Sequence, residues 1–189
     1  MNVSPSEAEE ALAAIQTMMK KTRRAISSSG AYVFLIVWGV IWLLGFLGSQ
    51  FLPKETASFT WMGLDILGGI LSAAIGVRMN RGVRSSSPTT SGKRIALFWL
   101  LLFFYCVAAV CVAWPTDGKQ FAMFIIIFVG VGWMAMGLLL SFASVWWGLA
   151  MIVLALIGYF LLPGIFYLWM AVLGGGGMIA LGLYIRSRW

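Results

Sequence analysis

The sequence predicts an all-α integral membrane protein: six transmembrane helices in three hairpins, preceded by a cytoplasmic amphipathic helix. Of its 189 residues, 61% are hydrophobic and only 10% are charged, whereas a soluble domain carries about 25% charged residues. Crossing a bilayer as a helix takes roughly 20 mostly apolar residues. Six runs have about that length, and they cover residues 31–52, 59–77, 95–115, 121–140, 142–162 and 164–185.

The segment 1–30 predicts a helix that lies outside the membrane. Ser4-Pro5-Ser6-Glu7 matches a capping box with proline at the first helical position. Apolar residues then recur on one face of the predicted helix, which is typical of an amphipathic helix; they are Ala8, Leu12, Ile15, Met19 and Ile26. This helix either lies on the membrane or the cytoplasmic face of the protein, or docks a partner helix. A Ser/Gly linker at 27–30 separates it from the membrane domain, 31–189.

The basic residues predict the orientation of the spans. Eleven fall on one side of a six-span arrangement: Lys20, Lys21, Arg23, Arg24, Arg78, Arg81, Arg84, Lys93, Arg94, Arg186 and Arg188. Only Lys54 and Lys119 fall on the other side. Lysine and arginine near span ends stay in the cytoplasm. Both termini are therefore expected on the cytoplasmic side of a bacterial inner membrane. The first nine of the eleven are also candidates for contact with anionic lipid or a protein partner. The net charge of +7 therefore needs no nucleic-acid partner.

The first and third hairpins share residues at nearly constant offsets, which predicts an internal repeat. The matched segments are Trp38-Gly39 with Trp147-Gly148, Leu52-Pro53 with Leu162-Pro163, Trp61-Met62 with Trp169-Met170, Gly68-Gly69 with Gly176-Gly177, and Arg78 with Arg186. In the middle hairpin Trp99 precedes Pro115 in the same manner. Since each hairpin begins in the cytoplasm, the repeats are parallel rather than inverted.

Glycine and proline recur in a common pattern in the first and third hairpins. The positions are Gly39, Gly45, Pro53, Gly69 and Gly76 in the first hairpin, and Gly148, Gly158, Pro163, Gly177 and Gly182 in the third. This pattern resembles that of the bacterial HdeD-like acid-resistance membrane proteins. The resemblance covers residues 31–185 and implies six spans and a stress-related role. It implies no defined reaction and no catalytic residues.

Asp65 is the one formally charged side chain within the six predicted spans. A charge in the bilayer costs at least about 2.5 kcal/mol, which makes such a residue a functional candidate. Ser72, Gly69 and Gly76 share its helix face, so Asp65 and Ser72 form a candidate proton or cation site. Two interpretations stay open. Asp65 is either a hydrogen-bonded structural residue or one in a shallow outer vestibule, or it carries protons or cations.

The remaining motifs indicate packing rather than chemistry. The chain has no histidine, and Cys106 and Cys111 lie in one apolar run, so no metal ligand set, cofactor or catalytic residue is expected. The run Gly174–Gly177 lacks the Lys-Ser or Lys-Thr of a phosphate loop. Glycines let helices approach closely; the candidate packing residues are Gly68, Gly69, Gly76, Gly174, Gly175, Gly176 and Gly177.

The sequence thus predicts a non-enzymatic membrane protein with a structural, stress-response or interaction role. Its partners are the lipid bilayer and either a second copy or another membrane protein. The alternative is a small proton- or cation-linked transporter or channel that uses Asp65.

Overall fold

The computed structural model describes residues 17, 31–82, 90–140 and 145–188. The predicted amphipathic helix and the 27–30 linker lie outside the described residues, apart from residue 17. The described residues form helices joined by short turns and contain no strand. The elements are α2 (Ala31–Phe51), α3 (Lys54–Gly82), α4 (Thr90–Ala113), α5 (Gly118–Leu140), α6 (Val145–Leu161), α7 (Phe166–Trp169), the π-helix η1 (Met170–Gly176) and α8 (Gly177–Arg188). The last three are continuous and are called the C-terminal rod.

Helices of the described chain have the length and composition that membrane crossing requires. Four are long and apolar enough to span a bilayer, over Tyr32–Phe51, Lys54–Arg78, Gly118–Leu138 and Phe166–Ser187. Two further apolar helical stretches are shorter, Leu97–Ala113 and Val145–Leu161. The structure therefore agrees with a helical membrane protein.

Three helices, α3, α4 and α5, begin earlier than their apolar runs, and in α3 and α5 the reason is that polar residues suit a first turn. The helix α3 starts at Lys54 rather than at residue 59, directly after Pro53, whose carbonyl accepts a hydrogen bond from the Ala57 amide at 2.9 Å. Its first turn also carries an acidic residue, which the helix dipole favours. The helix α5 starts at Gly118 because Asp117 caps it, accepting a hydrogen bond from the Gln120 amide at 2.8 Å.

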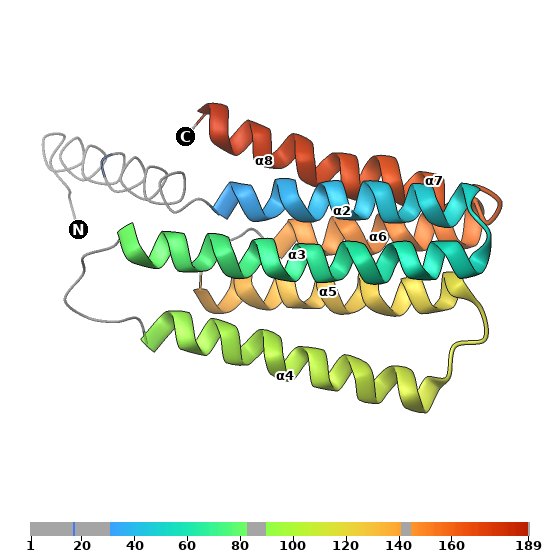
Figure 1. Cartoon of the computed structure of the whole chain (residues 1–189), viewed down its shortest axis with the longest axis horizontal. Helices are drawn as coiled ribbons and strands as arrows, with labels where there is room; N and C mark the ends of the chain where they lie inside the picture. The colour runs from blue at the N-terminus through green and yellow to red at the C-terminus, as the bar shows by residue number, and fades with distance from the viewer. Residues whose placement is uncertain (1–16, 18–30, 83–89, 141–144, 189) are drawn as a thin grey trace, which may run out of the picture.

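The helices lie side by side, and consecutive helices turn back at one end of the bundle (Figure 1). This turn end holds the connections from α2 to α3, from α4 to α5 and from α6 to α7. The helix α2 packs between α3 and the C-terminal rod, and α6 packs on α5 and on the rod. The helix α4 rests on α5 at the edge of the bundle and lies away from α3 (Figure 1).

The apolar core lies nearer the turn end. Its fully buried side chains are Phe166, Ile126 and Met170, joined by Ala155 and Ala171. Phe46 meets the rings of Trp42 and Trp61 edge to face, with ring centroids 5.6 and 5.0 Å apart. Within the described part of the chain, no polar or charged residue is buried in this core.

Glycines bring helices from different pairs into backbone contact. A methyl group on Gly39 of α2 would lie 2.9 Å from the Gly175 carbonyl oxygen, and one on Gly175 would lie 2.8 Å from that of Gly39. Likewise, a methyl group on Gly148 of α6 would lie 2.5 Å from the Gly130 carbonyl oxygen of α5. Real Cβ atoms almost never approach so closely, so both contacts require glycine.

Tryptophans fill the spaces over glycines within each pair. Trp61 covers Gly45 in the first pair and donates a hydrogen bond to the Ser49 hydroxyl at 2.8 Å. In the last pair, Trp169 covers Gly158 and donates to the carbonyl of Leu154 at 2.8 Å. In the middle pair the direction is reversed, because Trp99 of α4 covers Gly132 of α5.

Candidate functional site

Asp65 lies on α3 with its side chain exposed outside the bundle. It makes no hydrogen bond or ion pair with any other residue that the structure describes. Gly69 and Gly76 follow it along the helix, and a methyl group on either would have no atom within 4 Å. Both glycines of the predicted stripe thus face away from the described helices of the same chain.

Ser72 has a different role from that of Asp65. Its hydroxyl oxygen accepts a hydrogen bond from the indole nitrogen of Trp38 on α2, at 3.1 Å. Asp65 precedes Ser72 by seven residues, about 10 Å along the helix axis at 1.5 Å per residue. One cation does not reach both side chains directly, so the structure separates the two members of the predicted site.

The other predicted glycines divide into packed and open positions. Gly68 lies against Ile41 and Trp38 of α2, and Gly174 and Gly175 are buried beside α2. A methyl group on Gly177 would have no atom within 4 Å. One on Gly176 would meet only the carbonyl oxygen of Ala171, at 3.9 Å. The glycine run begins inside the π-helix and ends at the start of α8.

The predicted basic contact residues are only partly described. Arg78 is exposed on α3, away from the turn end. Arg81 lies near the end of α3, and Lys93 and Arg94 lie in the first turns of α4. The others of the nine, Lys20, Lys21, Arg23, Arg24 and Arg84, lie outside the described residues. The two cysteines are free: Cys106 is half-buried and Cys111 is exposed on α4.

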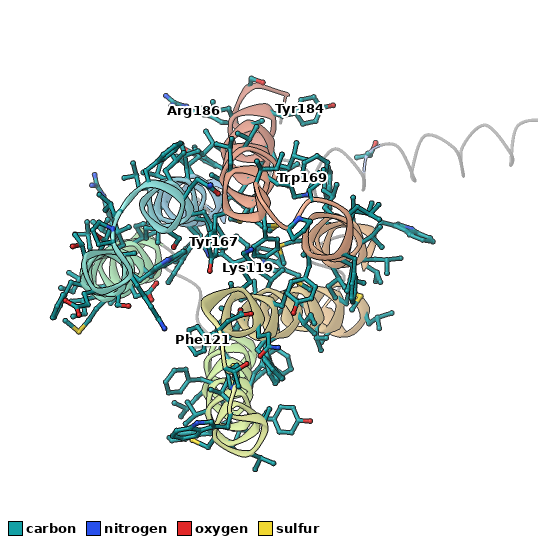
Figure 2. All side chains as sticks on the ribbon, turned by 90° about the vertical axis from the view of Figure 1, so that its right-hand side faces the viewer. Lys119, Phe121, Tyr167, Trp169, Tyr184 and Arg186 are labelled. Atoms are coloured by element: carbon teal, nitrogen blue, oxygen red, sulfur yellow. The ribbon has the colours of Figure 1, made fainter. Side chains whose placement is uncertain are left out.

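A polar cluster at the turn end joins the three helix pairs, and sequence reasoning did not find it. The ammonium group of Lys119 on α5 donates to the carbonyl of Pro163, which precedes the rod, at 2.6 Å. The Gln50 amide at the end of α2 donates to the Gly164 carbonyl at 3.5 Å, and its oxygen accepts from the Leu168 amide at 3.4 Å. Viewed from this end, Lys119 and Tyr167 lie near the centre of the bundle (Figure 2).

The turn-end cluster serves packing. Gly118 lies against Tyr167, since a methyl group there would be 2.8 Å from the phenolic oxygen. Thr116 donates to the Gln120 side-chain oxygen from both its amide, at 3.0 Å, and its hydroxyl, at 3.1 Å. Most of the polar groups in the turn-end cluster therefore form hydrogen bonds with one another or with nearby backbone groups. Over the described ranges, no three histidine, cysteine or acidic residues gather as metal ligands.

The sequence held one signal for this cluster, which is that Lys119 is one of two basic residues assigned to the non-cytoplasmic side. Its acceptor is a backbone carbonyl 44 residues further on, and no residue type marks such a partner.

Comparisons with protein-family models, with curated proteins and with solved structures find no match.

Proposed function

We propose that the chain is a six-span inner-membrane protein of three repeated hairpins, with a non-enzymatic structural, stress-response or interaction role. The observation that supports this role best is how the described helices are joined. Helices from different pairs meet through glycine contacts with a wholly apolar core between them. Such an interior suits assembly within a bilayer, where close van der Waals packing drives helix association.

The repeat is supported by the positions of the glycine contacts. Gly39 and Gly148 each follow a tryptophan, and each meets a glycine of a helix that runs in the opposite direction. Ile179 and Met134 lie four residues beyond those partner glycines, and both also contact the glycine that follows the tryptophan. A shared ancestor of the hairpins accounts for two contacts with the same geometry.

The orientation of the proposal follows from the basic residues. Arg78 and Arg186 are exposed on α3 and α8, at the end of the bundle opposite the turns. Placing that end in the cytoplasm satisfies the positive-inside rule. The stress-response element of the proposal comes from the resemblance to HdeD-like proteins and from nothing else.

Ion flux in proteoliposomes tests the role. We expect proteoliposomes that hold the purified protein to show the same proton and potassium flux as empty liposomes, and Asp65→Asn to change nothing. The matched control is Glu55→Gln, which removes a carboxylate at the exposed start of the same helix. A flux that the wild type supports, that Asp65→Asn abolishes and that Glu55→Gln retains would replace the structural role with transport through Asp65.

A further inference from the structure

The two glycine contacts between helix pairs follow one rule. In each, the outgoing helix of one pair (α2 or α6) meets the return helix of another pair (the C-terminal rod or α5). Gly39 and Leu43 of α2 correspond to Gly148 and Ile152 of α6. On the return helices, Gly175, Ile179 and Gly182 correspond to Gly130, Met134 and Gly137, with identical spacing.

The rule specifies a third contact, between the outgoing helix α4 and the return helix α3. Packing inside the pairs sets its register, because Gly68 lies against Trp38 and Ile41 while Gly132 lies against Trp99 and Leu102. The positions that match Gly39 and Leu43 are therefore Leu100 and Phe104 on α4. In this register, which is shifted by one residue from the repeat that aligns Gly68-Gly69 with Gly176-Gly177, those that match Gly130, Met134 and Gly137 are Ile66, Ile70 and Ala73 on α3.

This third contact is not formed within the chain. Leu100 and Phe104 are 51% and 60% exposed, and Ile66 and Ile70 are 58% and 61% exposed. The helices α3 and α4 stand apart in both views (Figures 1 and 2). Leucine and isoleucine occupy the two places where the formed contacts have glycine. A ring of three pairs needs the same close spacing at all three contacts, so these side chains keep it open.

We propose that a second copy of the chain fills this opening, with α3 of each copy packing on α4 of the other. The inference rests on the three-hairpin repeat of the proposed function and adds the partner. In one chain, a face of the outgoing helix α4 and a face of the return helix α3 have no partner helix. An outgoing helix and a return helix are also what pair in each of the two formed contacts. Two copies related by a two-fold axis along the membrane normal fill both faces at once and leave neither over.

The geometry suits a contact between separate chains. In copies with the same orientation in the membrane, α3 and α4 run antiparallel, as the helices do in both formed contacts. Apolar side chains at the contact set an ordinary interaxial distance of about 8–10 Å, wider than glycine allows. A copy that no short loop ties in place adopts that distance freely, whereas α4 of the same chain is held on α5 by Trp99 and by Tyr105 against Phe128.

Disulfide cross-linking between differently tagged copies tests the proposal. In a Cys106→Ser, Cys111→Ser background, one copy carries Ile70→Cys and the other carries Leu100→Cys. These positions match Ile179 and Gly39, which are in contact within the chain. Oxidation in native membranes with copper phenanthroline is expected to yield a dimer that holds both tags. The matched control replaces Ile70→Cys with Leu183→Cys, at a similar distance from its turn end and 49% exposed, and several-fold less dimer is expected.

Two outcomes would overturn the proposal that a second copy packs between α3 and α4. Cross-linking no stronger than the Leu183→Cys control would leave lipid or another protein as the cover of both faces. When Ile70→Cys and Leu100→Cys are placed in the same chain, an intrachain disulfide with no dimer would show that the ring closes within one chain. Neither outcome affects the six-span arrangement, which maleimide labelling of Thr116→Cys and Ser187→Cys tests separately in the same background.

Discussion

Gly175 is the residue at which the packing of the rod against α2 is tightest. A methyl group there would lie 2.5 Å from the backbone nitrogen of Leu43, and a backbone atom does not yield as a flexible side chain does. We expect Gly175→Ala to push the two helices apart and to lower the free energy of unfolding by about 1–3 kcal/mol, the usual cost of overpacking. Unfolding by SDS in mixed micelles measures it.

Gly177→Ala is the control for this substitution. Its methyl group would meet no atom within 4 Å, and alanine favours the helix over glycine by about 1 kcal/mol. Stability equal to or above that of the wild type is expected. Equal losses in the two variants would show that glycine serves backbone flexibility here rather than close approach.

At the same scale, sequence reasoning recognised the residue types that pack between helices, but not which individual residues of each type do so. The pattern places Gly68 and Gly69 next to each other, yet only Gly68 lies against α2. The direction of a helix face depends on where the neighbouring helices stand, and spacing along one helix does not contain that information. Asp65 shows the same limit, since its position is evident in the sequence and its exposed, unpaired state within the described chain is not.

At the scale of the element, the π-helix η1 is the main irregularity of the rod. Its hydrogen bonds span five residues instead of four, so it holds one residue more than the α-helical segment it replaces. Deletion of Gly176 is therefore expected to restore an α-helix while Phe166 and Gly182 keep their contacts with the core and with α2. We expect such a variant to elute as a monodisperse peak in detergent with a melting temperature near that of the wild type.

Deletion of Val40 in the regular helix α2 is the matched comparison. Val40 is 39% exposed, so little packing is lost directly. The deletion nevertheless turns all later residues of α2 by about 100° relative to those before it, which moves Phe46 out of the core. Aggregation or a large loss of yield is expected. Similar behaviour of both deletions would mean that the π-helix holds no surplus residue.

Hydropathy located the described helices well and their ends less well. The apolar run at 59–77 lies inside α3, which extends from Lys54 to Gly82. Hydropathy locates the apolar part of a helix. The helix itself continues into polar residues such as Lys54 and Glu55 until a proline or a cap ends it. The glycine run predicted tight packing or a kink, and its first three residues lie in the π-helix.

At the scale of the whole molecule, the proposed topology makes a direct prediction. In the cysteine-free background, Thr116→Cys at the turn end is expected to react with a membrane-impermeant maleimide in intact cells. Ser187→Cys near the end of α8 is expected to react only after the membrane is permeabilised. Both residues are exposed, so reactivity reports the side of the membrane. Labelling of Ser187→Cys in intact cells would contradict the cytoplasmic carboxyl terminus.

The arrangement of the pairs depends on contacts that sequence does not pair. Matching hairpins in the sequence predicts a repeat, but it does not tell that α2 meets the rod, that α6 meets α5, or that α3 and α4 stay apart. These choices depend on glycine being present at two contact positions and replaced by Leu100 and Ile66 at the third.

The contact between Gly39 and Gly175 joins α2 to the C-terminal rod, and these two elements lie far apart in the sequence. During synthesis, α2 and α3 are made long before the rod that covers Gly39. The glycine face of α2 therefore has no partner from the rod until the carboxyl-terminal segment leaves the ribosome. A chain that stops before the rod therefore lacks the backbone contact that Gly175 makes with Gly39 and Leu43 of α2.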